Sequence, residues 1–186
     1  HYYWFNNNLN QLVFIKYMKL ILVFLLIPTL SLCESFPIFN SLKYNEVNLR
    51  HYPEKDDPHL KTIKFVLTEK GMPVKVIRDY NAGGNIVEWY QVELFNGITG
   101  WIYHNQLSQK RRLLLRENTN LYLFNSYQEG SLRTKVKAKI LSPKIITLIT
   151  IKGKMAKVEF SHNDKIKSGW IILEDSIWGL LDKERN

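Results

Sequence analysis

The sequence predicts an all-β protein made of two small β-barrels in tandem, preceded by an N-terminal apolar segment. A repeat carries this prediction: Gly100-Trp101 and Gly169-Trp170 each open a short apolar run late in a similar block of chain. The offset is 69 residues at the glycines (169 minus 100) and 72 at Asn48 and Asn120 (120 minus 48). Solenoid units are shorter, about 20–50 residues, so this repeat is two copies of a small domain.

The first module is predicted over residues 44–107. Short alternating apolar runs, separated by turn residues, predict five strands at about 47–50, 65–67, 74–80, 89–94 and 100–103. A polar loop covers residues 51–62, and Asn96-Gly97 is a strong hairpin signal. Along the third strand, the alternation predicts that Val74, Val76 and Tyr80 share one face.

The second module is predicted over residues 113–180 on the same plan. Its five predicted strands are 121–123, 136–141, 145–151, 155–160 and 169–173. Lys152-Gly153-Lys154 forms a turn, and a longer polar loop, residues 161–168, replaces the Asn-Gly hairpin. Met155 stands where the first module has Trp89.

The N-terminal segment, residues 1–33, has the layout of an export signal. Met18-Lys19 precedes about a dozen apolar residues, and small and polar residues follow around Cys33. Two alternatives stay open: Cys33 as a lipidation site, although Leu32 departs from the usual small residue, and an uncleaved anchor helix. Residues 1–17 are either a translated stretch upstream of a start at Met18 or a genuine disordered extension. The predicted location is therefore the periplasm or outside the cell, with membrane contact only through this segment.

The chain has a formal net charge of +9, with 26 basic and 17 acidic residues. Residues 1–33 contribute two lysines and no acid, which leaves +7 for the rest. Such an excess favours anionic partners. The densest basic run, Lys110-Arg111-Arg112, lies at the join of the modules and reads either as a solvated connector or as a contact for a membrane or polyanion.

The first module contains four short motifs in a fixed order: Val47-Asn48-Leu49-Arg50, the run 70–77, Trp89-Tyr90-Gln91-Val92 and Gly100-Trp101-Ile102. This order resembles the bacterial SH3 domain family. Ile177-Trp178-Gly179-Leu180 resembles the end of paired SH3-like proteins. The likeness spans about residues 44–180 and implies two tandem SH3-like barrels. Because the acidic-aromatic signature of eukaryotic SH3 domains is absent, proline-rich peptide binding does not carry over.

The resemblance also implies where a ligand groove would lie, between the long first loop and the turn before the Trp-bearing strand. The candidate groove residues are Tyr52, Asp56, Asp57, Trp89 and Tyr90. Exposed aromatic rings would supply rigid contact area, and the two acids would hold amines of a peptide or muropeptide. Gly100, Trp101, Gly169 and Trp170 are interpreted as structural residues that hold the last strand of each module.

Catalytic and cofactor signals are missing from the sequence. Cys33 is the one cysteine, so the folded part has no thiol nucleophile, and Gly83-Gly84 lacks the features of a nucleotide loop. His51 and His59 share a loop with Asp56 and Asp57, where a weak metal site competes with a simple solvated loop. No enzyme activity, cofactor or metal is expected.

Three functions fit these observations. The leading hypothesis is an exported, non-catalytic binding module of the bacterial cell envelope that recognises peptidoglycan or a peptide. The alternative is protein–protein interaction or scaffolding in the periplasm, or towards a host after secretion. The third, binding of a polyanion through net charge, ranks last, and nucleic acid is not an expected partner because export argues against it.

Overall fold

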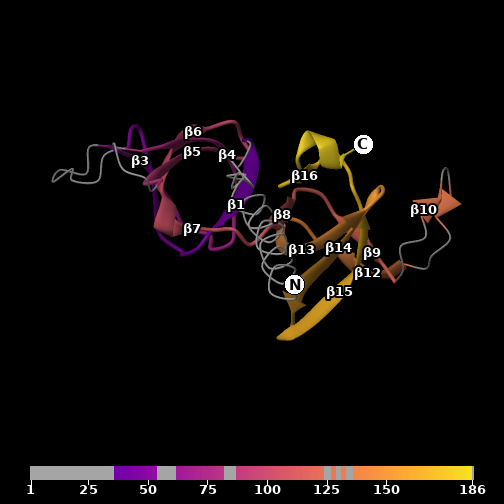
Figure 1. Cartoon of the computed structure of the whole chain (residues 1–186). Coiled ribbons are helices and arrows are strands. Elements are labelled where there is room, and N and C mark those ends of the chain that lie inside the picture. Colours follow the sequence, from indigo (N-terminus) through magenta and orange to yellow (C-terminus); the bar gives the residue numbers. More distant parts are fainter. Residues whose placement is uncertain are drawn as a thin grey trace, which may run out of the picture. The chain divides into compact units, whose positions relative to one another are not determined.

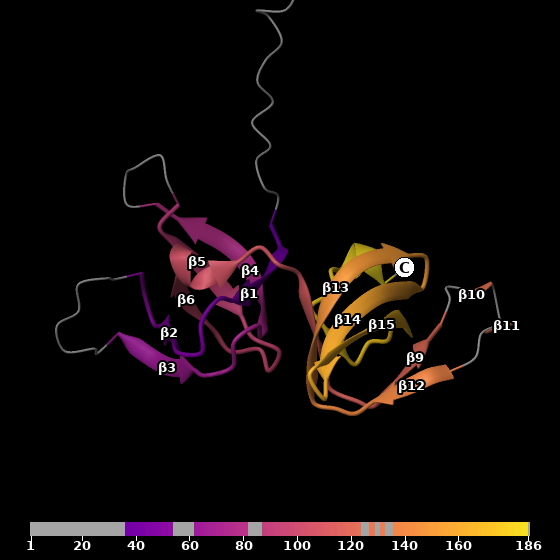
Figure 2. The ribbon, with the colours of Figure 1, turned by 90° about the horizontal axis from the view of Figure 1, so that it is seen from below.

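The computed structural model describes residues 36–53, 62–81, 87–123, 127–128, 131–132 and 136–185 (Figures 1 and 2). These residues form two sheets of seven antiparallel strands, and their helices are two short 3-10 turns, η1 (His104–Gln106) and η2 (Asp182–Glu184). The predicted all-β fold class with two β domains is confirmed. Both sheets belong to one compact unit, residues 35–186.

The first module contains the sheet ordered β3-β2-β6-β5-β4-β1-β7. Its strands are β1 (Ile38–Leu42), β2 (Val47–Arg50), β3 (Ile63–Leu67), β4 (Pro73–Tyr80), β5 (Trp89–Glu93), β6 (Thr99–Tyr103) and β7 (Leu107–Ser108). The sheet begins with β1, before the predicted start at residue 44, and it has two strands more than the predicted five.

The second module contains the sheet ordered β12-β9-β15-β14-β13-β8-β16. Its strands are β8 (Arg112–Leu115), β9 (Thr119–Tyr122), β12 (Val136–Ile140), β13 (Lys144–Lys152), β14 (Met155–His162), β15 (Lys165–Ile172) and β16 (Ile177–Trp178). A separate two-stranded ribbon consists of β10 (Tyr127–Gln128) and β11 (Ser131–Leu132), which pair with each other.

The two sheets have the same topology, since each strand of the first has a counterpart at the same place in the second. The pairs are β1 with β8, β2 with β9, β3 with β12, β4 with β13, β5 with β14, β6 with β15 and β7 with β16. The repeated Gly-Trp steps therefore occupy equivalent strands, β6 and β15.

The repeated glycine is needed because two strands approach each other too closely for a side chain. A Cβ atom on Gly100 would lie 2.6 Å from Leu49 Cγ and 2.8 Å from the Arg50 carbonyl oxygen. On Gly169 it would lie 2.7 Å from both Leu121 Cγ and the Tyr122 carbonyl oxygen. Matching obstructions in both modules explain why the Asn-Leu and Gly-Trp signals recur together.

Each module has its own apolar core between its strands. The first core is formed by Leu42, Val47, Leu49, Val74, Val76, Val92, Leu94, Ile102 and Leu107. The second is formed by Leu113, Leu115, Leu121, Ile140, Ile146, Ala156, Val158, Phe160, Ile171, Ile177 and Leu180. Burial of this apolar surface is the main term that stabilises each small domain.

One predicted face assignment is wrong. A register shift between Val76 and Arg78 interrupts the pairing of β4 with β5. Val76 pairs with the core residue Val92, whereas Tyr80 pairs with Trp89 on the opposite face. The extra residue of a β-bulge reverses the alternation beyond it, so Tyr80 does not share a face with Val74 and Val76.

Aromatic and polar contacts join the two modules. The Trp178 ring of β16 meets the Phe39 ring of β1 edge to face, with 5.2 Å between centroids, and Trp178 Nε1 donates to the Pro73 carbonyl oxygen at 3.0 Å. Ser41 Oγ donates to the carbonyl oxygen of Lys110 at 2.8 Å. Partly buried hydrogen bonds of this kind fix two surfaces in one register.

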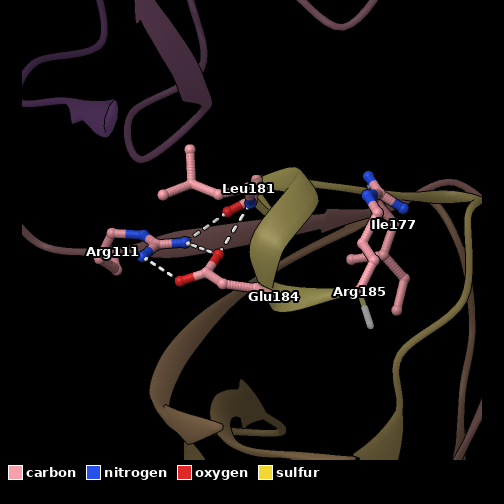
Figure 3. Close-up of polar contacts among 6 residues, drawn as sticks. Arg111, Ile177, Leu181, Glu184 and Arg185 are labelled. Atoms are coloured by element: carbon pink, nitrogen blue, oxygen red, sulfur yellow. Dashed lines mark hydrogen bonds and ion pairs between the residues drawn. The ribbon is translucent and has the colours of Figure 1, made fainter. Parts of the chain in front are cut away.

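The basic connector takes part in this junction instead of being a purely solvated link. Arg111 binds both carboxylate oxygens of Glu184 at 2.9 Å and donates to the Gly179 carbonyl oxygen at 2.8 Å (Figure 3). Its guanidinium also lies 6.0 Å from the Phe39 ring centroid. Bidentate pairing of this geometry is among the stronger charged contacts in proteins.

Burial raises the pKa of Glu184, but other interactions reverse the result. The hydrogen bonds from Arg111 and from the Leu181 N–H, together with the charges of Arg111 and Lys183, favour the carboxylate. The net effect is a pKa below the ordinary value of 4.5. Glu184 is therefore ionised at neutral pH and holds Arg111 against the C-terminal segment.

Candidate functional site

A group of aromatic and cationic side chains covers the outer face of the first sheet, opposite the core. Cross-strand pairing places Tyr80 beside Trp89, Trp89 beside Tyr103, and Arg50 beside Trp101. We call this group the aromatic face; its members are Arg50, Arg78, Tyr80, Trp89, Trp101 and Tyr103. These residues come from β2, β4, β5 and β6. They share one face because directly paired residues project to the same side of a sheet.

The rings of the aromatic face pack edge to face. The centroids of Trp89 and Tyr103 lie 5.2 Å apart at 70°, and those of Tyr80 and Trp101 lie 5.9 Å apart at 76°. Trp89 is 3% exposed and Trp101 is 7% exposed, whereas Tyr80 is 42% exposed. The two tryptophans therefore form a rigid floor, and Tyr80 is the ring that a ligand reaches most easily.

Two arginines lie against this floor. The Arg50 guanidinium carbon is 5.9 Å from the Trp89 ring centroid, and that of Arg78 is 5.1 Å from the Trp101 centroid. Arg50 Nη1 donates to the Thr62 hydroxyl, and Arg78 Nε donates to the side-chain oxygen of Gln91. Both guanidinium groups are thus oriented before any ligand binds.

The charge of this face is positive among the described residues. The carboxylate of Glu93 lies 3.6 Å from Lys75, its cross-strand partner, so these two charges offset each other. Arg50 and Arg78 have no carboxylate partner in the described part of the chain. An oriented guanidinium presents parallel N–H donors that match a carboxylate. The face is therefore suited to a ligand with carboxylates and apolar surface.

Among the predicted groove residues that the structure describes, Trp89 and Tyr90 do not share one surface. Trp89 lies on the outer face, whereas its neighbour Tyr90 packs against the core and meets Phe36 at 6.5 Å between centroids. Tyr52 follows β2 and is 51% exposed. Asp56 and Asp57 lie outside the described residues. The structure thus places Trp89 in the candidate site and Tyr90 on the opposite side of the same strand.

The predicted structural residues lie on equivalent strands. Gly100 and Gly169 are buried, Trp101 is buried, and Trp170 is half-buried. Lys157 pairs with Trp170 as Gln91 pairs with Trp101. Both tryptophans therefore occupy the same outer-face position of their module.

Sequence reasoning missed Arg50, Arg78 and Tyr80 as site residues. For Arg50 a signal existed, since it alternates with the apolar Val47 and Leu49 and must project away from the core. For Arg78 and Tyr80 the signal was hidden, because the bulge in β4 reverses the face that simple alternation assigns.

The described residues contain no cluster of three or more His, Cys, Asp or Glu side chains placed to hold a metal ion. Within that same part of the chain, no helix has the length and apolar character needed to cross a membrane.

Comparison with known proteins gives distant structural likenesses. No protein-family model and no curated protein matches this chain. A solved structure of NlpC1 from Trichomonas vaginalis is similar, with 15% identity and a TM-score of 0.29, over 80% of this chain and 48% of that one. NlpC2 from Trichomonas vaginalis has 14% identity and a TM-score of 0.29, over 76% and 48%.

This chain therefore spans about half the length of the two NlpC proteins. Identities and TM-scores at this level establish no shared function.

Proposed function

We propose that this chain is a non-catalytic binding protein of the bacterial cell envelope whose first module binds a carboxylate-bearing peptide, such as the peptide of peptidoglycan. One observation carries the proposal: two oriented guanidinium groups, Arg50 and Arg78, lie on a floor of buried tryptophans. The resemblance of the sequence to bacterial SH3 domains and the predicted export segment, residues 1–33, support the location.

The chemistry of the face agrees with a peptide ligand. Ligand carboxylates would accept hydrogen bonds from the arginines, and an aliphatic side chain would cover Tyr80. The sequence suggested that Asp56 and Asp57 bind amines of the ligand. In this proposal, Arg50 and Arg78 bind carboxylates of the ligand instead. Because the arginines are held by Gln91 and Thr62, little side-chain entropy is lost when they bind.

Co-sedimentation of the purified chain with isolated peptidoglycan sacculi, at low and high salt, tests the proposal. Arg78→Gln and Tyr80→Ser are the informative variants, because both residues are exposed. Trp89→Ala is less useful, since removing a buried ring also leaves a cavity. Lys157→Gln is the matched control: it removes one positive charge from an exposed site of the second module.

We expect pelleting that survives high salt, a roughly tenfold weaker association for Arg78→Gln, and an unchanged one for Lys157→Gln. If Arg78→Gln and Lys157→Gln reduce pelleting equally, and if pelleting falls steeply as the salt concentration rises, the chain binds through its net charge instead. No pelleting under any condition would refute wall binding.

A scaffolding role is the second candidate, and the junction between the modules favours it. Contacts of Trp178 with Phe39 and Pro73 hold the two sheets together, so the pair presents one continuous surface to a protein partner. This alternative predicts that Arg78→Gln leaves partner capture unchanged.

A further inference from the structure

A cavity of about 320 Å³ opens on the second module, away from the aromatic face. Three cations line it, Lys110, Arg112 and Lys144, together with the single carboxylate of Glu159. Ile145 and Phe160 form part of its apolar wall. The volume is at the lower end of the range for small-ligand sites, which is about 300–1,000 Å³.

The guanidinium of Arg112 has no hydrogen-bond or ion-pair partner in the part of the chain that the structure describes. Its Nε is buried without a hydrogen bond, and among the described residues the side chain forms no ion pair. The Nε of its neighbour Arg111 is also buried without a hydrogen bond, but the terminal nitrogens of Arg111 bind both oxygens of Glu184. The terminal nitrogens of Arg112 have no acceptor among the described residues, so they can donate to a ligand that accepts hydrogen bonds.

Packing holds this guanidinium in position. A Cβ atom on Gly71 of the first module would lie 2.5 Å from Arg112 Nη1 and 2.9 Å from its Cζ. The close approach to this glycine means that the arginine is placed by van der Waals contact without using its N–H donors.

Strand register sets the distribution of charge across the site. Arg112 of β8 pairs with Thr147 of β13, which pairs with Glu159 of β14. Paired residues share a face, and neighbouring strands lie about 4.8 Å apart, so the guanidinium and the carboxylate arise about 10 Å apart on one row. No ion pair joins them. The row thus offers a cationic end and an acceptor end.

We infer that this cavity binds the end of a short peptide with a free C-terminal carboxylate and an aliphatic terminal side chain. The carboxylate accepts hydrogen bonds from Arg112 beside Lys110 and Lys144. The aliphatic group packs on Ile145 and Phe160, and a peptide N–H further along donates to Glu159. A phosphate dianion fits less well, because Glu159 repels the second charge.

Titration of the full chain, followed by backbone amide NMR shifts, tests this inference. The probes are N-acetylalanylleucine, its C-terminal amide and inorganic phosphate. The acid should bind about tenfold more tightly than the amide, since a charged hydrogen-bonded pair is lost in the amide. Phosphate should bind more weakly than the acid.

Two variants with the same chemistry locate the site. Lys144→Gln should weaken acid binding by about threefold or more, and Lys157→Gln, outside the cavity, should leave it unchanged. Arg112→Lys keeps the charge but loses the planar guanidinium with its parallel N–H donors, so it should also lower the affinity for the dipeptide acid. Unchanged amide spectra away from the cavity confirm that each variant is folded.

Equal affinities for the acid and the amide would overturn the inference, as would phosphate binding as tightly as the acid. Equal weakening by Lys144→Gln and Lys157→Gln would overturn it too. The inference stands apart from the proposed function, because it concerns the other module. Arg78→Gln should leave dipeptide binding unchanged even if sacculi do not bind at all.

Discussion

The two modules keep the same inner face and differ on the outer face. Leu49 and Leu121 are both fully buried, and each faces the glycine of its Gly-Trp step. On the outer face, the first module has Arg50, Arg78, Trp89, Gln91, Trp101 and Tyr103, where the second has Tyr122, Thr150, Met155, Lys157, Trp170 and Ile172. Topology thus depends on core volume and close strand approach, while the outer face is free to change its chemistry.

The largest effect should come from the shared glycine. Gly100→Ala and Gly169→Ala should each destabilise the chain by about 3 kcal/mol, because the added Cβ meets a backbone oxygen that cannot move aside. Urea denaturation followed by tryptophan fluorescence measures this loss.

Gly153→Ala is the control, since nothing lies within 4 Å of its Cβ position although its φ is 58°. It should cost about 1 kcal/mol, from backbone strain alone. If Gly100→Ala lowers the free energy of unfolding much more than Gly169→Ala does, the two glycines do not have equivalent roles in their modules.

Much of the fold was predictable, because the sequence repeat and the alternation of apolar and polar residues along the strands both follow from which residues are buried in the core. The sheet strands β1, β7, β8 and β16 were not predicted, and β1 shows why. Its Asn40 is 6% exposed and Ser41 is 1% exposed, so polar residues that read as loop are buried by pairing with β4 and β7. Ser41 also donates to the Lys110 carbonyl oxygen, 69 positions away. A buried polar side chain whose hydrogen-bond partner lies far away in the sequence leaves no local sequence pattern.

The candidate site was predictable only in part. Trp89 was predicted as a groove residue and Trp101 only as a structural residue, while Tyr90, also predicted for the groove, points to the core, as alternation requires. Of the two cations on the aromatic face, Arg50 follows simple alternation, but the position of Arg78 depends on a bulge in β4 that no local sequence signal marks. The polar loop that holds Asp56 and Asp57 lies outside the described residues.

The junction between the modules gives the next largest effect. Trp178→Ala should destabilise the chain by about 2 kcal/mol, because it removes a half-buried ring that packs on Phe39 and a hydrogen bond to Pro73. The two modules should then unfold in separate transitions, seen by calorimetry. Trp178→Phe should keep the ring contact and recover part of the loss. A single unchanged transition in Trp178→Ala would show that other contacts couple the modules.

A pH effect of about 1 kcal/mol should come from Glu184, whose side chain is 17% exposed. Since its folded pKa lies below 4.5, its contribution is present above pH 4.5 and is lost as pH falls through the folded pKa. Glu184→Gln should therefore lower stability at pH 7 and have little effect in acid. Asp175→Asn, which alters the exposed pair with Arg185, is the control and should change little. An equal loss from Glu184→Gln at both pH values would refute the ionic origin.

The smallest effect tests whether the outer faces can be exchanged. Arg78→Thr should cost about 0.5 kcal/mol, the value of an exposed contact between a cation and a ring. The reverse change, Thr150→Arg, should gain almost nothing alone, because Thr150 pairs with Lys157 where Arg78 pairs with Gln91. Adding Lys157→Gln removes this repulsion and should yield a gain of about 0.5 kcal/mol beside Trp170. Urea denaturation of the single and double variants measures the difference. If the two are equally stable, the second face lacks the geometry that holds Arg78 on Trp101, and the equivalence of the modules ends at their cores.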